Sequence, residues 1–221
     1  MHDIVNLTVH GIGPTVRELD PGEDETWVKI DQFEQVLDAI KGRDDVRITF
    51  DDGNASDVEI ALPALLERGI TGEFFVLAGR LGEPGRLTPE QVQELDQAGM
   101  KIGSHGWAHI DWRKISADEA VQEMVKANQL LGELIGRPVT RVAIPFGSYD
   151  RNVLRRLRQA GVTRAYTSDG GHARRDAWLQ PRTSLRHDID EAWTAEVLDG
   201  VPSLPSRARG VAARLVKRTR G

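Results

Sequence analysis

Short apolar runs alternate along the chain with longer segments in which apolar residues recur every three or four positions. The runs are rich in branched and aromatic residues and predict strands, whereas the periodic segments predict amphipathic helices that stop at glycine. The expected strands cover residues 4–10, 46–50, 73–77, 100–103, 141–144 and 164–167, and the expected helices cover 33–40, 57–68, 88–99, 116–136 and 150–161. The strand starts recur at intervals of roughly 25 to 40 residues, which predicts parallel strands joined by helical crossovers.

This rhythm fits two α/β folds equally, a (β/α) barrel of parallel strands or an open doubly wound parallel sheet. Residues 11–26 are polar with Gly and Pro and predict a loop. After Gly170 the rhythm is less clear, with one or two strands expected within 178–185 and a last helix over 189–198. A chain of 221 residues that is 39% hydrophobic can form one large core. We therefore expect a single domain over residues 1–205, followed by a tail at 206–221.

Several helix starts carry explicit capping signals. Thr88 precedes a proline and has Gln91 three residues on, and Ser116 has Glu119 at the same spacing. Asp150 is expected to cap the helix that follows it. Pro63 must either begin the regular part of its helix or kink it, because proline cannot donate an interior backbone hydrogen bond.

Composition removes several classes of function. The chain has no cysteine, which excludes disulfides, thiolate metal sites and cysteine nucleophiles, so a bound metal must use His, Asp, Glu or water. A formal net charge of -5 argues against a general nucleic-acid binder. The N-terminus lacks the basic and apolar regions of a signal peptide, and no apolar run approaches the ~18 residues that span a bilayer, so we expect a cytoplasmic location.

The C-terminal tail differs in charge from the rest of the chain. Residues 207–221 contain six Lys or Arg and no acidic residue, so the remainder carries -5 - 6 = -11. A narrow apolar stripe beside this charge would allow weak peripheral contact of residues 207–220 with the inner face of a membrane. A solvated C-terminus explains the same composition.

Polar residues follow four of the expected strands. These pairs are Asp51 and Asp52, Ser104 and His105, Pro145 and Phe146, and Ser168 and Asp169. The carboxyl ends of parallel strands form the active face of α/β folds, so we expect these residues to share one rim.

The carboxylate pair and the histidine pair together supply the donors of a metal site. His105 and His109 are four residues apart, a spacing that places both imidazoles on one face of a helical turn, and Gly106 favours a turn from strand to helix here. Two imidazoles and one carboxylate leave coordination positions open for water and substrate, and the second carboxylate is then free to act as a base. His10 also lies at a strand end, where it could approach the site or be a structural histidine.

Three segments resemble successive motifs of a known family. Residues 49–53 (Thr-Phe-Asp-Asp-Gly), 104–109 (Ser-His-Gly-Trp-Ala-His) and 143–150 (Ala-Ile-Pro-Phe-Gly-Ser-Tyr-Asp) are similar to motifs of the polysaccharide deacetylases, the NodB-homology group known as carbohydrate esterase family 4. The resemblance extends from about His10 to His187. It implies a distorted βα barrel and one divalent metal ion, usually zinc, that serves to remove acetyl groups from N-acetylated sugars.

The resemblance also implies roles for single residues. Asp52, His105 and His109 would hold the metal, Asp51 would be the general base, and the backbone N–H of Phe146 would stabilise the oxyanion. Residues 185–187 (Leu-Arg-His) match a late motif whose histidine protonates the leaving amine, which implies His187 as the acid.

The chain departs from the family pattern at two places. Many members have an arginine that pairs with the base where this chain has Ala143. We hypothesise that Arg182 supplies the missing guanidinium to Asp51. The family also has a fourth motif, which lies between residues 150 and 185 here and is blurred, because Asp169 and Asp176 are both candidates to orient His187.

The leading hypothesis is therefore a metal-dependent hydrolase that removes an N-acetyl or related acyl group, such as formyl, from an amino sugar or its nucleotide- or lipid-carrier-linked form. A non-haem iron oxygenase would use the same ligand set. A non-catalytic sugar-binding module on the same fold is the third alternative. Trp107 and Trp112 flank the histidine motif and would either stack on a sugar ring or belong to the core.

Overall fold

Eight parallel strands form a sheet that curves into a nearly closed barrel, with one further strand antiparallel to them. This computed structural model describes residues 3–19, 22–199 and 217. The strands lie in the order β10 (Leu179–Pro181), β8 (Arg164–Thr167), β7 (Arg141–Ala143), β6 (Lys101–Ser104), β5 (Glu73–Val76), β4 (Val46–Phe50), β1 (Asp3–Val9) and β11 (Thr183–Ser184), and β9 (His172–Arg174) pairs with β1. The predicted distorted barrel and single domain are confirmed, in preference to the open doubly wound sheet.

The seam of the barrel lies between two strands that are almost consecutive in sequence. β10 stands at one end of the sheet order and β11 at the other, and Arg182 is the single residue between them. The first and last strands of the sheet are therefore tethered to each other through this one residue.

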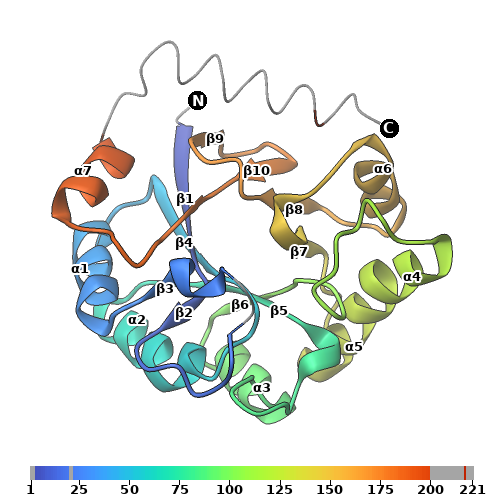
Figure 1. Ribbon diagram of the computed structural model, residues 1–221, viewed down its shortest axis with the longest axis horizontal. Coiled ribbons are helices and arrows are strands. Elements are labelled where there is room, and N and C mark those ends of the chain that lie inside the picture. The colour runs from blue at the N-terminus through green and yellow to red at the C-terminus, as the bar shows by residue number, and fades with distance from the viewer. Residues whose placement is uncertain (1–2, 20–21, 200–216, 218–221) are drawn as a thin grey trace.

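Helices cover the outside of the barrel (Figure 1). They are α1 (Ile30–Ile40), α2 (Leu62–Arg68), α3 (Pro89–Gln97), α4 (Ala117–Val121), α5 (Ala127–Ile135), α6 (Arg151–Gln159) and α7 (Glu191–Asp199). The predicted caps are present, since Thr88, Ser116 and Asp150 accept hydrogen bonds from the backbone N–H three residues on. Each cap satisfies a backbone donor that the first turn of a helix leaves unpaired.

The strands are buried on both faces, which explains their nearly continuous apolar runs. Phe50 and Phe74 stack at 4.4 Å between ring centroids and belong to the large core cluster shared with the helices, with Phe33 packed edge-on at 6.0 Å. Phe75, Ala143 and Tyr166 form a separate cluster. Alternate residues of one strand thus pack into different layers, as the pleat of a strand requires.

Two predicted helices are interrupted by π-helical turns. The expected helix at 57–68 consists of the π turn Asp57–Ala61 and α2, with Pro63 in the first turn of α2. The expected helix at 116–136 contains α4, the π turn Gln122–Lys126 and α5. A π turn inserts one extra residue into a helix, a feature that hydrophobic periodicity does not reveal.

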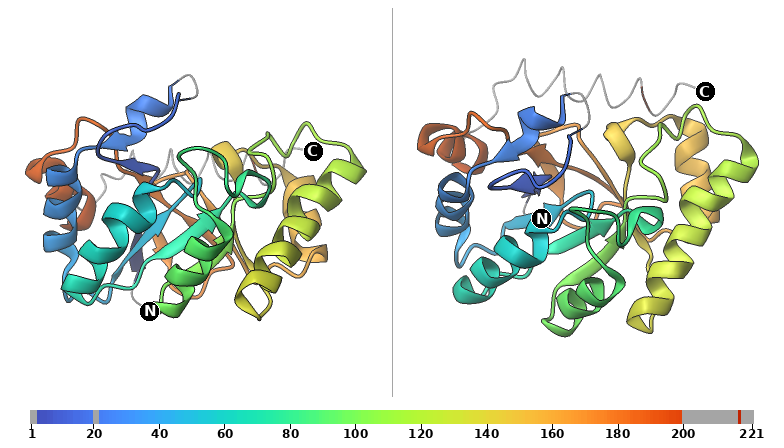
Figure 2. Two further views of the ribbon diagram at one scale, coloured as in Figure 1. Left: turned by 90° about the horizontal axis from the view of Figure 1, so that it is seen from below. Right: turned by 60° about the horizontal axis from the view of Figure 1, so that its bottom comes forward.

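The segment at 11–26, predicted as a loop, contains short regular elements. These are β2 (Gly11–Ile12) and the 3₁₀ turn Glu23–Thr26, and β2 pairs with β3 (Trp27–Val28). Further 3₁₀ turns cover Ala78–Arg80 and Pro145–Gly147. The blue segment that holds β2 and β3 projects beyond the end of the barrel in the side view of Figure 2. Two-residue strands and β9 are too short to leave a periodic signal in the sequence.

The C-terminal part is described only as far as Asp199, together with Lys217. The last helix expected after Gly170 is present as α7, and the one or two strands expected within 178–185 are two, β10 and β11. The expected boundary at 205/206 and all of the 207–220 tail except Lys217 lie outside the described residues. None of the helices that the structure describes combines the length and the apolar character that crossing a bilayer requires.

Candidate metal centre and active-site pocket

A pocket of about 210 Å³ lies at the carboxyl ends of the parallel strands. Its walls are formed by His10, Gly22, Glu23, Thr26, Asp51, Asp52, Arg86, His105, His109, Ile144, Phe146 and Ser168. Residues that follow β1, β4, β6, β7 and β8 therefore meet in one place, together with the 3₁₀ turn Glu23–Thr26. We call this the active-face pocket.

Three of the pocket residues are placed as a metal site would require. Nε2 of His105 is 3.5 Å from Oδ1 of Asp52, and Nε2 of His109 is 3.6 Å from the same oxygen. These three ligand atoms all lie within 4.8 Å of one another. Two ligands at about 2.1 Å from a zinc ion and at tetrahedral angles are separated by about 3.4 Å. The observed separations therefore fit a shared divalent ion.

The buried oxygen of Asp52 supports the same interpretation. Oδ1 of Asp52 is buried and has no hydrogen-bond partner among the described residues, although the carboxyl group is almost fully enclosed. An unsatisfied buried oxygen is costly, and a cation would satisfy it. Arg86 donates to the carbonyl of Asp52 and to Oδ1 of Asn54, which fixes the backbone of this turn.

Both imidazoles are held with Nε2 toward Asp52. Nδ1 of His105 lies 2.9 Å from the carbonyl oxygen of Ala143, a bond that makes Nδ1 the donor and leaves Nε2 free as a ligand. The ring of His109 rests on the ring of Phe146 at 4.3 Å between centroids. Burial lowers the pKa of His109 to about 4 despite the opposing charge of Asp52. At neutral pH His109 is therefore the uncharged imidazole that a metal binds.

The loop that carries the two histidines is irregular, which corrects the expected strand-to-helix turn. β6 ends at Ser104, and the next helix, α4, begins only at Ala117. The backbone of His109 has φ 57°, a left-handed conformation. The two imidazoles therefore meet because the loop folds back on itself, and helical spacing plays no part.

Glu123 holds this loop in shape. It lies in the π turn of the long helix, is buried, and accepts hydrogen bonds from the backbone N–H groups of Trp107 (2.9 Å) and Ala108 (3.0 Å) and from Nε1 of Trp112 (3.0 Å). Gly106 is needed beside it, because its φ is 88° and a Cβ there would lie 2.4 Å from Oε2 of Glu123. Sequence reasoning missed Glu123, although a carboxylate on the buried face of an amphipathic helix was the available signal.

Asp51 forms a buried ion pair with Arg182. Nη1 and Nη2 of Arg182 donate to the two oxygens of Asp51 at 2.7 and 2.6 Å, and both side chains are buried. The structure thus forms the contact that the sequence hypothesis required, and Ala143 instead packs with Phe75 and Tyr166. Burial by itself would raise the pKa of Asp51, but the charge of Arg182, aided by His105, outweighs it and holds that pKa well below its usual value.

Backbone strain is concentrated in this pocket. Asp52 (φ 74°), His109 (φ 57°) and Phe146 (φ 58°) are the non-glycine residues with positive φ in the part of the chain that the structure describes. Such conformations cost free energy and persist only where the surrounding structure enforces them. Each of the three residues also lines the active-face pocket.

The predicted acid, His187, lies outside the pocket wall. Its side chain is exposed, and its Nδ1 lies 3.1 Å from the carbonyl oxygen of Glu25. Neither candidate partner meets it: Asp169 accepts hydrogen bonds from Tyr149, Thr167 and Lys217, and Asp176 pairs with Arg174. By contrast, His10 lines the pocket, and its buried Nδ1 has no hydrogen-bond partner among the described residues.

The two tryptophans that flank the histidine motif belong to the core. Trp112 is buried in a hydrophobic cluster, and Trp107 packs against the large core and over Gly79. Neither lines the active-face pocket. The alternative in which they stack on a sugar is therefore not supported at this pocket.

Comparison with known proteins identifies the family that the sequence motifs resemble. The sequence model described as "Polysaccharide deacetylase" matches residues 38–165. YxkH of Bacillus subtilis is 29% identical over 131 residues, which cover 59% of this chain and 47% of YxkH. The peptidoglycan-N-acetylglucosamine deacetylase of Bacillus cereus is 26% identical over 161 residues, which cover 69% of this chain and 56% of that enzyme. The chain thus spans about half the length of these curated relatives.

Solved structures support the fold. The Streptococcus pyogenes deacetylase PplD in complex with acetate superposes with a TM-score of 0.78, at 21% identity, over 90% of this chain and 99% of that one. At this level of identity the similarity establishes the barrel and leaves the chemistry to be argued from the residues of this chain.

Glu123→Gln should weaken metal binding while leaving the fold intact. One of the two carboxylate oxygens becomes an NH₂ group, so one loop N–H loses its acceptor and the imidazoles lose their fixed orientation. We expect the affinity for zinc to fall about tenfold or more, as for other residues that support metal ligands. A competition titration against a zinc chelator measures this.

The matched control is Glu133→Gln, an exposed glutamate on α5. Equal zinc affinities of the two variants would show that Glu123 does not position the loop.

Proposed function

Because the chain belongs to the polysaccharide deacetylase family, we propose that it is a metal-dependent hydrolase that removes an N-acetyl or related acyl group from an amino sugar. The observation that carries the proposal is that two adjacent carboxylates have different partners. Asp52 faces the two imidazoles, whereas Asp51 lies beside that set, bonded to Arg182 and with Oδ2 3.8 Å from Nε2 of His105.

Asp52, His105 and His109 would hold one divalent ion, for which zinc is the natural choice because a carboxylate and two imidazoles leave a coordination position open. When bound, such an ion polarises an amide carbonyl and acidifies a water molecule. Fe(II) accepts the same donor set, but the family membership of the chain favours hydrolysis over oxygen chemistry.

Asp51 is proposed as the general base. Arg182 keeps it ionised across the whole physiological range of pH, so it is always ready to accept a proton. The lowered pKa also makes it a weak base, which is suited to an already acidified water. Arg182 therefore acts by positioning Asp51 and by keeping it charged.

Phe146 is proposed to stabilise developing negative charge on the carbonyl oxygen through its backbone N–H. Its left-handed backbone sits in the 3₁₀ turn Pro145–Gly147, and its exposed ring covers His109. A backbone donor held in a strained turn is already oriented before the reaction begins, which is the basis of this type of catalysis.

A proton must reach the leaving amine, and two histidines are candidates. His187 follows from the family motif, whereas the geometry favours His10, which lines the same pocket as Asp51 and the metal-binding residues. Removal of the proton donor would slow departure of the amine and leave metal binding unchanged.

The substrate class is proposed from the relatives of this chain. The Bacillus cereus relative is a peptidoglycan-N-acetylglucosamine deacetylase by name, and we extend to this chain an N-acetylated amino sugar as substrate. The same site would accept a formyl group, and the sugar could be part of a glycan or linked to a carrier. The basic tail at 207–220 would suit a carrier-linked sugar at a membrane, a role that remains a proposal.

Replacing each of the two aspartates singly by asparagine distinguishes their proposed roles. Asp52→Asn should lose zinc binding and acetate release together, whereas Asp51→Asn should keep zinc and release acetate at least about a hundredfold more slowly. Acetate release from N-acetylglucosamine oligomers, measured after chelation and again after zinc is restored, tests both variants and the proposed function itself.

Absence of acetate and formate release from a zinc-loaded wild-type protein would count against the hydrolase. Retained binding of the oligomer in that case would favour the non-catalytic sugar-binding module.

Arg182→Lys should move the acidic limb of the pH profile of kcat/KM to higher pH. Asp51 works as the carboxylate, so activity is lost as pH falls through its pKa. Loss of the bidentate guanidinium raises that pKa toward its usual value. Arg155→Lys, an exposed arginine of α6, is the control. An acidic limb that stays in place in Arg182→Lys would contradict the pairing argument.

His10→Gln and His187→Gln distinguish the two candidate acids. If His10 is the acid, its variant should lose about a hundredfold or more in kcat and the basic limb of the pH profile, while zinc affinity stays within a few-fold. His187→Gln should then remain near wild type. The reverse result would assign the acid to His187 and would require its side chain to leave the carbonyl of Glu25 during turnover.

A further inference from the structure

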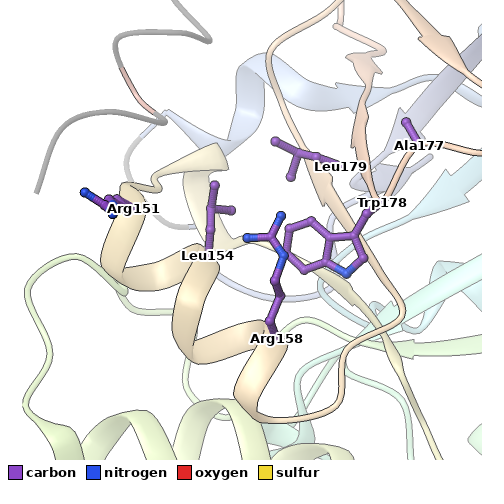
Figure 3. Close-up of a pocket in the computed structure, with 6 residues that line it drawn as sticks. All are labelled: Arg151, Leu154, Arg158, Ala177, Trp178 and Leu179. Atoms are coloured by element: carbon purple, nitrogen blue, oxygen red, sulfur yellow. The ribbon is translucent and has the colours of Figure 1, made fainter.

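A second pocket, of about 380 Å³, lies on the outside of the barrel between α6 and the start of β10. Arg151, Leu154 and Arg158 line it from α6, and Ala177, Trp178 and Leu179 line it from the other side (Figure 3). We call it the α6 pocket. It shares no residue with the active-face pocket.

The pocket exists because the βα rhythm breaks after β8. In the described chain, α6 connects β7 to β8, but β8 is followed by β9 and β10 without an intervening helix. The outer side of β10 is therefore open beside α6. Leu154 and Leu179 are buried here, and the half-buried Trp178 forms a wall.

The ring of Trp178 is fixed in place and carries a stacked guanidinium. Nε1 of Trp178 donates to the carbonyl of Val162 at 2.8 Å. The guanidinium carbon of Arg158 lies 4.2 Å from the centroid of the ring, and Figure 3 shows the side chain lying over it. A stacked guanidinium keeps its in-plane N–H donors free for a bidentate contact with a carboxylate or phosphate.

The positive charge of α6 is not neutralised by acidic side chains. The helix contains four arginines and no acidic residue. The arginine ion pairs among the described residues all involve arginines outside α6. No carboxylate of the described residues therefore lies within 4.0 Å of an α6 guanidinium group. This concentration of charge contrasts with a chain whose formal net charge is -5.

The helix dipole does not account for all of these arginines. Arg156 and Arg158 lie in the last turn of α6, where a cation is favourable, but Arg151 lies in the first turn, where it is unfavourable. Arg151 and Arg158 are two helical turns apart, about 10 Å along one side of the helix. Both line the pocket, whereas the exposed Arg155 does not.

We propose that the α6 pocket binds a carboxylate or phosphate group of an anionic glycan, with Arg158 as the bidentate anchor and Arg151 as the second cation. The inference rests on the proposed function, because it extends the binding of a sugar polymer beyond the reacting residue. α6 begins at Arg151, five residues after Phe146 of the active-face pocket, whereas Arg158 and Trp178 lie at the end of α6 and the start of β10, toward the amino ends of the parallel strands. A glycan that occupies both pockets would therefore pass from the rim down the outside of the barrel along α6.

Binding is measured by isothermal titration with three probes. A tetrasaccharide of alternating glucuronic acid and N-acetylglucosamine presents carboxylates, N-acetylglucosamine 1-phosphate presents a phosphate, and the N-acetylglucosamine tetrasaccharide is neutral. The wild-type protein should bind at least one anionic probe about tenfold more tightly than the neutral one. The two anionic probes show which group the pocket prefers.

Arg158→Gln should abolish this preference, and Arg158→Lys should retain only part of it because lysine keeps the charge without the planar stack. Arg155→Gln is the matched control, since it removes the same charge from the same helix but outside the pocket. Equal losses in Arg155→Gln and Arg158→Gln, or equal affinities for neutral and anionic probes, would overturn the proposal.

Sedimentation with phosphatidylglycerol vesicles separates a pocket from a flat basic surface. Vesicle binding that depends on Arg155 as much as on Arg158 would assign the charge to a membrane surface and overturn the glycan site.

Failure of the proposed function and failure of the α6 pocket can be told apart. Because the binding titration needs no catalytic turnover, a protein that binds the probes but has no deacetylase activity would count against the proposed deacetylase only. Unchanged binding in Arg158→Gln would count against the α6 pocket only.

Discussion

The buried pair between Arg182 and Asp51 is the interaction on which both the barrel and its site depend. Arg182 is the one residue between the two strands that bound the sheet, and Asp51, 131 positions earlier, follows β4, which only β1 separates from β11. The pair therefore fastens the seam of the barrel to a strand two places in from it. Removal of one partner of such a buried pair typically costs about 3–5 kcal/mol, because the other charge is left uncompensated. The same contact sets the ionisation of the proposed base, so stability and chemistry cannot be altered separately here.

Around this pair, the fold enforces a geometry that the backbone does not prefer. The left-handed residues Asp52, His109 and Phe146 surround the pocket, and each such conformation costs on the order of 1–3 kcal/mol. Buried hydrogen bonds oppose this cost: Glu123 fixes the histidine loop, and Arg86 fixes the turn at Asp52. The three atoms that would hold a divalent ion thus lie at separations that fit tetrahedral coordination, and a site fixed in this way would need little further ordering to bind one.

The arrangement also explains how two adjacent aspartates can differ in role. Asp51 faces the guanidinium and the barrel interior, whereas Asp52, after a left-handed turn, faces the imidazoles. The active-face pocket lies at the carboxyl ends of the strands, where α/β folds usually place binding sites. The α6 pocket lies instead on the outside of the barrel, where no helix separates β8 from β10 in the described chain.

The sequence alone determined the parallel βα rhythm, the capped helices and the common rim of Asp51, Asp52, His105 and Phe146, because periodicity and capping are local properties of the chain. It also led, through the family resemblance, to the hypothesis that Arg182 meets Asp51. Only the tertiary structure decided the rest. The π turn that presents Glu123, the irregular path that joins His105 to His109, the entry of His10 into the pocket and the exposure of His187 all depend on contacts between distant segments. Such contacts leave no periodic signal, because they are set by how packed elements constrain the loops between them.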